Sequence, residues 1–165
     1  MAEKKSPDDV TVLVRNKKAR HDYHVERTIE AGIQLRGSEV KSLRDAKASI
    51  SDAYATVKNG EMWLMQLQIS EYAWAHYDQH DPKRERKLLL HRREIETLGD
   101  AVQAKGYTLL PLELYLKRGK VKVLLGLCKG KRVHDKREAE KERTAKREID
   151  REFGGAAGRG AGRHK

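Results

Sequence analysis

The chain of 165 residues carries a formal net charge of +11, and its hydrophobic and charged residues amount to 38% and 37%. This length fits one compact domain with residues to spare, and the modest apolar content excludes a large hydrophobic core. The single cysteine, Cys128, excludes an internal disulfide and a zinc site made of several cysteines, so we expect a reducing compartment.

The N-terminal residues 1–9 are polar, and we expect them to be flexible. They lack the apolar stretch of a signal peptide, and no segment of the chain approaches the run of about 18 apolar residues that spans a membrane. We therefore expect a soluble, cytoplasmic protein with no membrane partner. The next residues, VTVLV at 10–14, are rich in β-branched side chains and predict a first strand.

Apolar residues then alternate from Tyr23 to Leu35, where six of the seven odd-numbered positions are apolar. A period of two is typical of a half-buried strand. Gly32 inside this segment predicts a bulge or a bend. Ser38 predicts the N-cap of a short helix over residues 37–46.

Residues 52–69 predict a hairpin, because Asn59 and Gly60 suit a two-residue turn in which both residues have positive φ. We expect Trp63 and Trp74 in the core of the fold rather than exposed for stacking on bases. After the turn, the apolar residues expected on one face of the strand are Trp63, Met65, Leu67 and Ile69.

Residues 80–87 predict a charged loop, and residues 88–106 predict a helix that ends at Gly106. A second hairpin is predicted over residues 107–131, and Pro111 in it indicates a sheet edge or a bulge, because proline cannot donate a ladder hydrogen bond. The inward positions expected for the helix are Leu90, Ile95, Leu98 and Val102.

These elements amount to about six short strands and two or three helices. We therefore predict a mainly β fold of the α+β class, a small antiparallel barrel with flanking helices, because closure of the sheet leaves no unpaired strand edge. The expected organisation is a barrel domain over residues 10–130 followed by a basic tail over residues 131–165.

The excess positive charge lies in two segments. Residues 83–93 carry six basic and one acidic side chain, residues 129–165 carry thirteen basic and seven acidic, and the remaining residues carry seventeen of each sign. Such segments predict binding to a polyanion, most often nucleic acid, and a solvated loop is the alternative for the first of them. The candidate phosphate contacts in the first segment are Lys83, Arg84, Arg86 and Lys87.

The tail divides in two. Residues 131–153 are rich in strong helix formers but offer no apolar face to a core, so we predict a helix-prone segment that is disordered when free. We expect it to fold against a negatively charged partner, and the alternative is a tail that only aids solubility. Residues 154–165 are Gly-rich and predict a flexible end.

Indications of a metal site are weak. His76 and His80 are four residues apart with Asp78 and Asp81 beside them, but no cysteine or second histidine pair completes the set. We therefore expect no metal and no other cofactor.

Enzymatic activity is also weakly indicated. His21, His24 and Glu26 could form an acid–base set for RNA cleavage, but no catalytic motif is recognisable. We expect a protein that is not an enzyme. The alternatives to an RNA-binding adaptor are a small ribonuclease and a structural RNA-binding protein of the ribosome.

Four strings occur in order across roughly residues 10–150. They are NKKARHDY (16–23), EAGIQLRGSEVKSLRDAKASISDAY (30–54), DPKRERKLLLHRREI (81–95) and GYTLLPLELYLKRGKVKVLLGLCKGKRVHDKRE (106–138). They resemble the small protein B family, the tmRNA-binding proteins of bacterial trans-translation. The resemblance implies an oligonucleotide-binding-fold-like β-barrel with flanking helices.

The same resemblance implies partners. Family members bind the tRNA-like domain of tmRNA and deliver it, with elongation factor Tu and GTP, to stalled ribosomes. The tail of the family enters the decoding centre, where it meets small-subunit rRNA, and the empty mRNA path.

The resemblance also implies site residues. Among them we expect Lys122 to meet phosphate and Leu89 to offer an apolar contact, whereas Glu30 is unexpected because a carboxylate repels phosphates. The residues implied in RNA binding are Glu30, Leu89 and Lys122, with Asn16, Arg20, His21 and Tyr23 expected on the same surface. The residues implied in ribosome contact are Gly130, His134, Asp135, Lys136 and Arg137.

Overall fold

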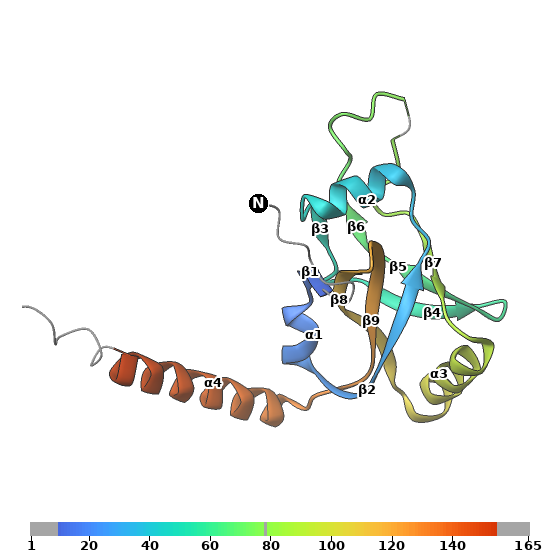
Figure 1. Ribbon diagram of the computed structural model, residues 1–165. Helices are drawn as coiled ribbons and strands as arrows, with labels where there is room; N and C mark the ends of the chain where they lie inside the picture. Colours follow the sequence, from blue (N-terminus) through green and yellow to red (C-terminus); the bar gives the residue numbers. More distant parts are fainter. Residues whose placement is uncertain (1–9, 78, 155–165) are drawn as a thin grey trace, which may run out of the picture. The chain divides into compact units, whose positions relative to one another are not determined.

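The computed structural model describes residues 10–77 and 79–154, and the chain divides into two units, Met1–Gly130 and Lys131–Lys165 (Figure 1). The predicted flexible segment 1–9 and residues 155–165 of the Gly-rich end lie outside the described residues. The elements of the first unit are β1 (Val10–Arg15), α1 (Lys17–Asp22), β2 (Tyr23–Ile33), α2 (Gly37–Arg44), β3 (Ala48–Ser49), β4 (Tyr54–Lys58), β5 (Glu61–Met65), β6 (Gln68–Ile69), β7 (Arg86–Leu89), α3 (Arg92–Lys105), β8 (Thr108–Lys117) and β9 (Lys120–Gly130). The second unit contains helix α4 (Val133–Gly154).

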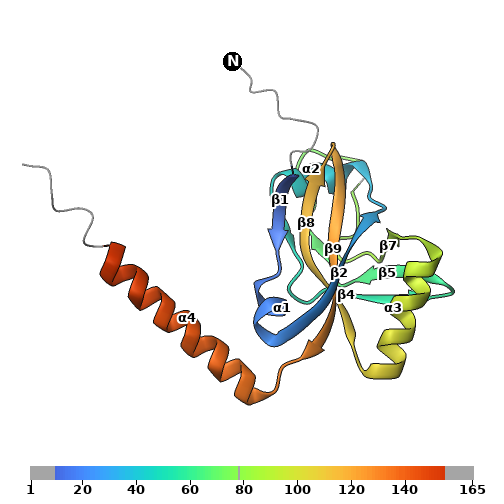
Figure 2. The ribbon, with the colours of Figure 1, turned by 60° about the horizontal axis from the view of Figure 1, so that its bottom comes forward.

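The strands of the first unit close into an antiparallel barrel. The ring runs β8-β4-β5-β7-β2-β9 and closes because β9 also pairs with β8, while β1 pairs with the second half of β8. Figure 2 shows β2, β9 and β8 side by side. The strands β3 and β6 form a separate two-stranded sheet. The predicted α+β barrel is therefore confirmed.

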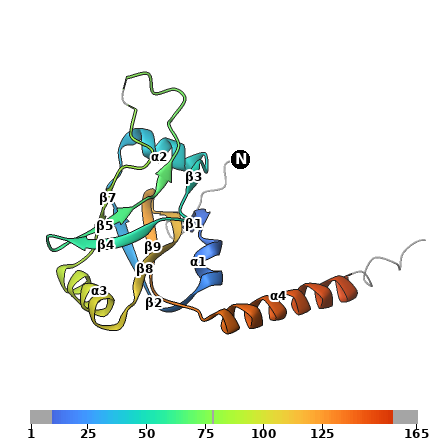
Figure 3. The same cartoon turned by 180° about the vertical axis from the view of Figure 1, so that it is seen from behind.

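The helices of the first unit flank this barrel. Helix α1 contacts β2 and β8, α2 contacts β6, and α3 contacts β4, β5 and β8. Seen from the front and from behind, α2 and α3 lie at opposite ends of the barrel (Figures 1 and 3). Helix α3 begins at Arg92, after a capping box between His91 and Glu94, and not at residue 88 as predicted, because Leu88 and Leu89 belong to β7. It ends, as predicted, at Gly106 with φ of 66°.

Aliphatic side chains fill the barrel, and every strand of the ring contributes at least one. Their burial removes apolar surface from water, which is the main source of stability in a domain of this size. The buried core residues include Leu64 of β5, Leu88 of β7, Leu114 of β8, Val123 and Leu125 of β9, and Ile95 and Leu98 of α3.

Both tryptophans lie outside this core, which corrects the prediction. Trp63 is half-buried, and Trp74 is 76% exposed in the loop after β6. In β5 the inward residues are Met62 and Leu64 instead of Trp63 and Met65. Gln66 then adopts a positive φ of 57°, which interrupts the alternation and returns Leu67 and Ile69 to the interior.

The turns follow the sequence more closely. Asn59 and Gly60 have φ of 52° and 74°, as the predicted hairpin requires. The strand register shifts between Pro111 and Glu113, which confirms the bulge expected at the proline. No bulge occurs at Gly32, because the register shift in β2 lies between Val25 and Arg27, and the bend offered there as the alternative stays a prediction.

Three further results differ from the predictions. Residues 17–22 form helix α1, which the sequence reading did not predict, and Arg86 and Lys87 of the predicted charged loop belong to strand β7. Ser38 lies inside α2, whose N-cap is Arg36.

Helix α4 spans most of the second unit and covers the segment predicted to be helix-prone. Its apolar Ile149 is exposed. The idea that this segment orders only on a partner stays a prediction. Across residues 10–77 and 79–154, no helix combines the length and the apolarity needed to cross a bilayer.

Candidate nucleic-acid interface

The strand register places four residues in one row on the outer side of the barrel. Leu89 of β7 pairs with Gly32 of β2, Gly32 pairs with Lys122 of β9, and Lys122 pairs with Tyr115 of β8. Directly opposed residues of an antiparallel pair share a face of the sheet. Their sequence neighbours Leu88 and Val123 are buried in the barrel, so the row faces outward.

A second row lies beside the first. Glu30 of β2 pairs with Leu124 of β9, Leu124 pairs with Glu113 of β8, and Glu113 pairs with Arg15 of β1. Because Glu30 and Gly32 are two residues apart on one strand, the two rows are neighbours on the same face. We call this surface, made of the two rows, the outer sheet face.

A shallow depression of about 410 Å³ opens on the outer sheet face. It brings together Glu30, Leu89 and Lys122, which lie on three strands and are far apart in sequence. Leu89 is 54% exposed, which is unusual for a leucine in a strand. The residues that line this depression, which we call the sheet hollow, are Glu30, Gly32, Leu89, Leu90, His91, Glu94 and Lys122.

Leu89 stands between the sheet hollow and a second depression. The second depression, of about 480 Å³, extends toward the turn at Asn59 and Gly60 and also contains Lys87 and Arg92. Lys87 is held by Glu61, with 2.7 Å between Nζ and Oε1. Each depression holds one lysine, Lys122 in the first and Lys87 in the second. An exposed apolar side chain between them can contact a ribose or base while the lysines meet phosphates.

Gly32 keeps the sheet hollow open. A Cβ atom added at Gly32 would lie 3.1 Å from the Cβ and 3.4 Å from the Cδ1 of Leu89. A methyl group there would therefore displace Leu89 by a few tenths of an ångström. The glycine is required by the close approach of Leu89 and not by its backbone conformation.

We expect Gly32→Ala to weaken RNA binding several-fold, because it shifts Leu89 and narrows the hollow. The free energy of unfolding should change by less than about 1 kcal/mol, because the lower chain entropy of alanine offsets the crowding. The check is a filter-binding titration beside urea unfolding. The matched control is Gly37→Ala, since no atom lies within 4 Å of a Cβ at Gly37. Equal affinities of the two variants would contradict this role of Gly32.

Glu30 is held in place by two neighbours. The Tyr115 hydroxyl donates to Glu30 Oε2 at 2.5 Å, and Lys117 Nζ lies 3.1 Å from the same oxygen. The Tyr115 hydrogen bond lowers the pKa of Glu30; burial opposes this, and Lys117 and Lys122 reinforce it. Glu30 is therefore ionised at neutral pH, and its charge is balanced by lysine on the same face.

The block NKKARHDY is only partly on this face. Asn16 is buried, which corrects its assignment as an RNA contact: its Nδ2 donates to the carbonyl oxygens of Ile50 and Pro111, and its Oδ1 accepts from Ala19 N–H. It caps α1 and ties that helix to two distant segments. Arg20 does reach the outer sheet face, where it lies 3.2 Å from Glu113 Oε1.

The other two residues of the block lie at the junction of α1 and β2. His21 Nδ1 is 2.8 Å from Asp22 Oδ1. Tyr23 packs on a small apolar cluster formed by Ala19, Leu110, Leu112 and Cys128. Glu26, considered with His21 and His24 as an acid–base set, accepts a hydrogen bond from Tyr107 and thereby raises the pKa of that phenol.

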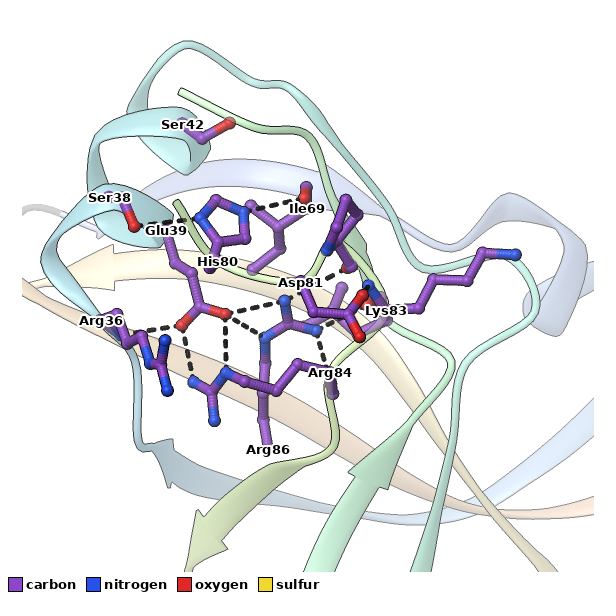
Figure 4. Close-up of polar contacts among 12 residues, drawn as sticks. Arg36, Ser38, Glu39, Ser42, Ile69, His80, Asp81, Lys83, Arg84 and Arg86 are labelled. Carbon is purple, nitrogen blue, oxygen red and sulfur yellow. Dashed lines mark hydrogen bonds and ion pairs between the residues drawn. The ribbon is translucent and has the colours of Figure 1, made fainter. Parts of the chain in front are cut away.

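The basic residues before Leu89 differ in their surroundings: Arg84 and Arg86 point toward Glu39, whereas Lys83 points away from it (Figure 4). Arg86 is 0% exposed, so its assignment as a phosphate contact is wrong. Arg84 is mostly covered and lies 2.7 Å from Glu39 Oε2. Lys83 and the partly exposed Lys87 keep accessible side chains and stay candidate phosphate contacts.

Glu39 of α2 is the centre of this buried network. Its carboxylate contacts Arg84 and Arg86 and accepts the Arg36 N–H at 2.7 Å. Burial, the largest influence, raises the pKa of Glu39, but the Arg84 hydrogen bond, the Arg36 N–H and the Arg86 charge together lower it. Arg86 also donates to the carbonyl oxygens of Leu67 and Arg84. The cluster joins α2, β7 and the preceding loop.

His80 belongs to the same region. Its Nε2 lies 3.0 Å from the Ile69 carbonyl oxygen, which can only accept, so Nε2 carries a proton. Its Nδ1 lies 3.0 Å from Ser38 Oγ. Both ring nitrogens are thus occupied within the protein, whereas His76 is exposed. Within the described part of the chain, which omits Asp78, no group of residues is arranged to hold a metal ion.

The residues expected to contact the ribosome lie at the end of β9 and in α4. Gly130 is exposed and pairs with Tyr23. Arg137 is exposed on α4, and the Lys136 N–H donates to the Arg132 carbonyl oxygen. His134 and Asp135 lie within α4, but their side chains are outside the described residues.

The sequence reading missed Tyr115, Lys117 and Glu39. A signal for the first two was present, because the apolar residues of β8 at even positions from Leu112 to Leu116 leave positions 113, 115 and 117 on the other face. Glu39 carried no local signal, since its partners lie 45 and 47 residues further along the chain.

A closed β-barrel that presents lysines, an exposed leucine and an ion-paired carboxylate on one sheet face belongs to the class of RNA-binding barrel proteins. Within that class, a family profile described as "SmpB protein" matches residues 13–155, and the chain belongs to the SmpB protein family.

Its relatives agree with this assignment. The SsrA-binding proteins of Staphylococcus aureus strains Newman and MRSA252 are each 53% identical over 153 residues, which cover 93% of this chain and 97% of theirs. A chain of the solved structure "tmRNA-SmpB: a journey to the center of the bacterial ribosome" is 46% identical, with a TM-score of 0.63. The match covers 78% of this chain and 94% of that one.

Proposed function

We propose that this chain binds SsrA RNA, the tmRNA of trans-translation, through the outer sheet face and acts as a non-enzymatic adaptor in ribosome rescue. The observation that carries the proposal is the sheet hollow, which gathers Glu30, Leu89 and Lys122 from three strands. Relatives named for binding SsrA, and a similar chain from a tmRNA structure, support the choice of RNA.

Each of these side chains has a chemical role in the proposal. Lys122 neutralises a phosphate, which fixes the position of the RNA and makes affinity depend on salt. Leu89 packs against a ribose or a base. The RNA bound here is the tRNA-like domain of tmRNA, and elongation factor Tu with GTP joins through that RNA and not through the barrel.

The second unit serves the ribosome in this proposal. Helix α4 and the preceding Gly130 enter the decoding centre and the empty mRNA path, where the basic residues meet small-subunit rRNA. The positive charge of residues 129–165 supports this role. The contacting residues proposed for this segment are Gly130, His134, Asp135, Lys136 and Arg137.

We expect Lys122→Ala to weaken binding of a transcript of the tRNA-like domain roughly tenfold at moderate salt. The slope of log K against log salt should become shallower by about 1, because one phosphate contact is lost. The control is Lys47→Ala, an exposed lysine outside the sheet hollow. The measurement is a salt titration of both variants by fluorescence anisotropy. An unchanged slope for Lys122→Ala would refute its phosphate contact.

The competing functions make different predictions. A ribonuclease would cleave labelled structured RNA with turnover, and the cleavage would be lost in His24→Ala. A structural ribosomal protein would stay with salt-washed subunits during sedimentation, whereas an adaptor dissociates. Either result would replace the proposal.

A further inference from the structure

The two oxygens of the Glu30 carboxylate have different surroundings. Oε2 accepts the Tyr115 hydroxyl at 2.5 Å and lies 3.1 Å from Lys117 Nζ. Oε1 lies at the longer distance of 3.5 Å from the same ammonium group. Since each carboxylate oxygen can accept two hydrogen bonds, Oε1 keeps capacity for another donor. The Glu30 side chain is 38% exposed and lines the sheet hollow, so a ligand in the hollow can reach it.

Tyr115 is the fixed part of this pair. The residue is 7% exposed, and it lies on β8 between Lys122 of β9 and Val12 of β1. Burial, the Glu30 hydrogen bond and the nearby Glu113 charge all raise the pKa of the phenol, so it keeps its proton. A buried aromatic ring has few accessible rotamers. Its hydroxyl therefore donates to Glu30 from a fixed position before any ligand arrives.

The charge around Glu30 suits an acceptor on an RNA-binding face. The carboxylates that line the sheet hollow are Glu30 and Glu94, and Glu94 accepts the His91 N–H in the cap of α3. Lys117 and Lys122 offset the charge of Glu30. A phosphate can therefore approach Lys122 while Glu30 faces a different part of the same nucleotide or its neighbour. RNA offers hydrogen-bond donors only at base N–H groups and at the 2′-hydroxyl.

We propose that Tyr115 is a positioning residue: its hydroxyl fixes the Glu30 carboxylate so that Oε1 accepts a hydrogen bond from an RNA donor, beside the phosphate contact of Lys122. This proposal rests on the proposed binding of tmRNA. It also explains why a carboxylate lies in a phosphate-binding hollow. The Glu30 carboxylate makes binding specific for an RNA group that donates a hydrogen bond, and it does not attract the phosphates. Because Tyr115 already fixes the carboxylate in the free protein, binding does not carry the entropic cost of ordering it.

The test is a double-mutant cycle on binding of a transcript of the tRNA-like domain. Tyr115→Phe keeps the ring and removes only the hydroxyl, and we expect it to weaken binding about fivefold with no change in the salt slope. Glu30→Gln should weaken binding at least as much. In the Glu30→Gln background, Tyr115→Phe should cost less than about twofold, because the group that it positions is gone. When Tyr115→Phe or Glu30→Gln is combined with Lys122→Ala, the fold losses in affinity should multiply.

Two results would overturn the proposal. One is full affinity of Tyr115→Phe. The other is independent losses in Tyr115→Phe and Glu30→Gln, which would show a general effect of the hydroxyl on stability rather than positioning. Urea unfolding of each variant reports whether the fold persists. If wild-type protein binds the transcript no better than an unrelated tRNA, the proposed function itself fails, and this outcome is distinct from both.

The same assay can identify which group of the RNA donates the hydrogen bond to Glu30. Transcripts with single 2′-deoxy nucleotides remove one hydroxyl each, and inosine in place of guanosine removes the amino group. The modified RNA on which wild type and Glu30→Gln bind equally identifies the donor. The series is completed with analogues that lack, one at a time, each other exocyclic amino group and ring N–H. If the advantage of wild type persists with every such RNA across the protected region, the acceptor role of Oε1 is refuted.

Discussion

Arg86→Met is expected to lower the free energy of unfolding by about 3–5 kcal/mol, because it leaves the buried carboxylate of Glu39 without its buried partner. The methionine also removes the donors to the carbonyl oxygens of Leu67 and Arg84. Urea unfolding followed by circular dichroism measures the change.

The chain offers a matched control in Arg84→Met. Arg84 contacts the same carboxylate but is 25% exposed in its side chain, so water can replace part of what is lost. Arg84→Met should lower the free energy of unfolding clearly less than Arg86→Met does. Equal costs would contradict the account in which the burial of Arg86 sets the magnitude.

The same cluster sets a dependence of stability on pH. Because the pKa of Glu39 is lowered in the folded protein, its contribution is complete above the unfolded pKa of about 4.3. It is lost as the pH falls through the lower folded pKa. In Arg86→Met the free energy of unfolding should fall less steeply as the pH is lowered, because one of the charges that lower the pKa of Glu39 is absent.

Truncation after Gly130 is expected to abolish tagging on stalled ribosomes while the affinity for the tRNA-like domain changes less than about threefold. The sheet hollow and the barrel core lie entirely within residues 10–130, so the RNA-binding face survives. The tail carries a large share of the positive charge, and some loss of nonspecific affinity is expected. The measurements are anisotropy with the transcript and a reconstituted tagging assay.

A milder variant separates charge from chain length. Replacing Lys136 and Arg137 with alanine keeps α4 and removes two cations of the described helix. Tagging should fall while transcript binding stays near wild type. Loss of transcript binding on truncation would instead show that the tail contributes to the tmRNA site.

Local sequence patterns predicted the parts of the fold that depend on neighbouring residues. The turn at Asn59 and Gly60, the end of α3 at Gly106 and the bulge at Pro111 follow from conformations that these residues adopt in any context. The alternation of apolar and polar residues predicted the positions of β8 and β9 for the same reason. It misplaced Trp63, because the irregular residue Gln66 shifts the phase and carries no distinguishing sequence signal.

The candidate site was predictable only as separate residues. The resemblance pointed to Glu30, Leu89 and Lys122, but nothing in the sequence indicates that Leu89 and Lys122 both lie opposite Gly32. That neighbourhood depends on strand register between distant segments. The same holds for Tyr115, whose hydroxyl donates a hydrogen bond to Glu30, 85 residues away in the sequence.

The sequence by itself determined the barrel class, the hairpins, the two basic segments and the resemblance to one family, since each depends on composition, spacing or local conformation. Only the tertiary structure decided which basic residues are available to RNA. Arg86 and Lys87 are adjacent and chemically alike, yet Arg86 is buried against Glu39 and Lys87 faces solvent. The reason is physical: alternate residues of a strand face opposite sides, and a buried cation is stable only where the fold supplies a carboxylate.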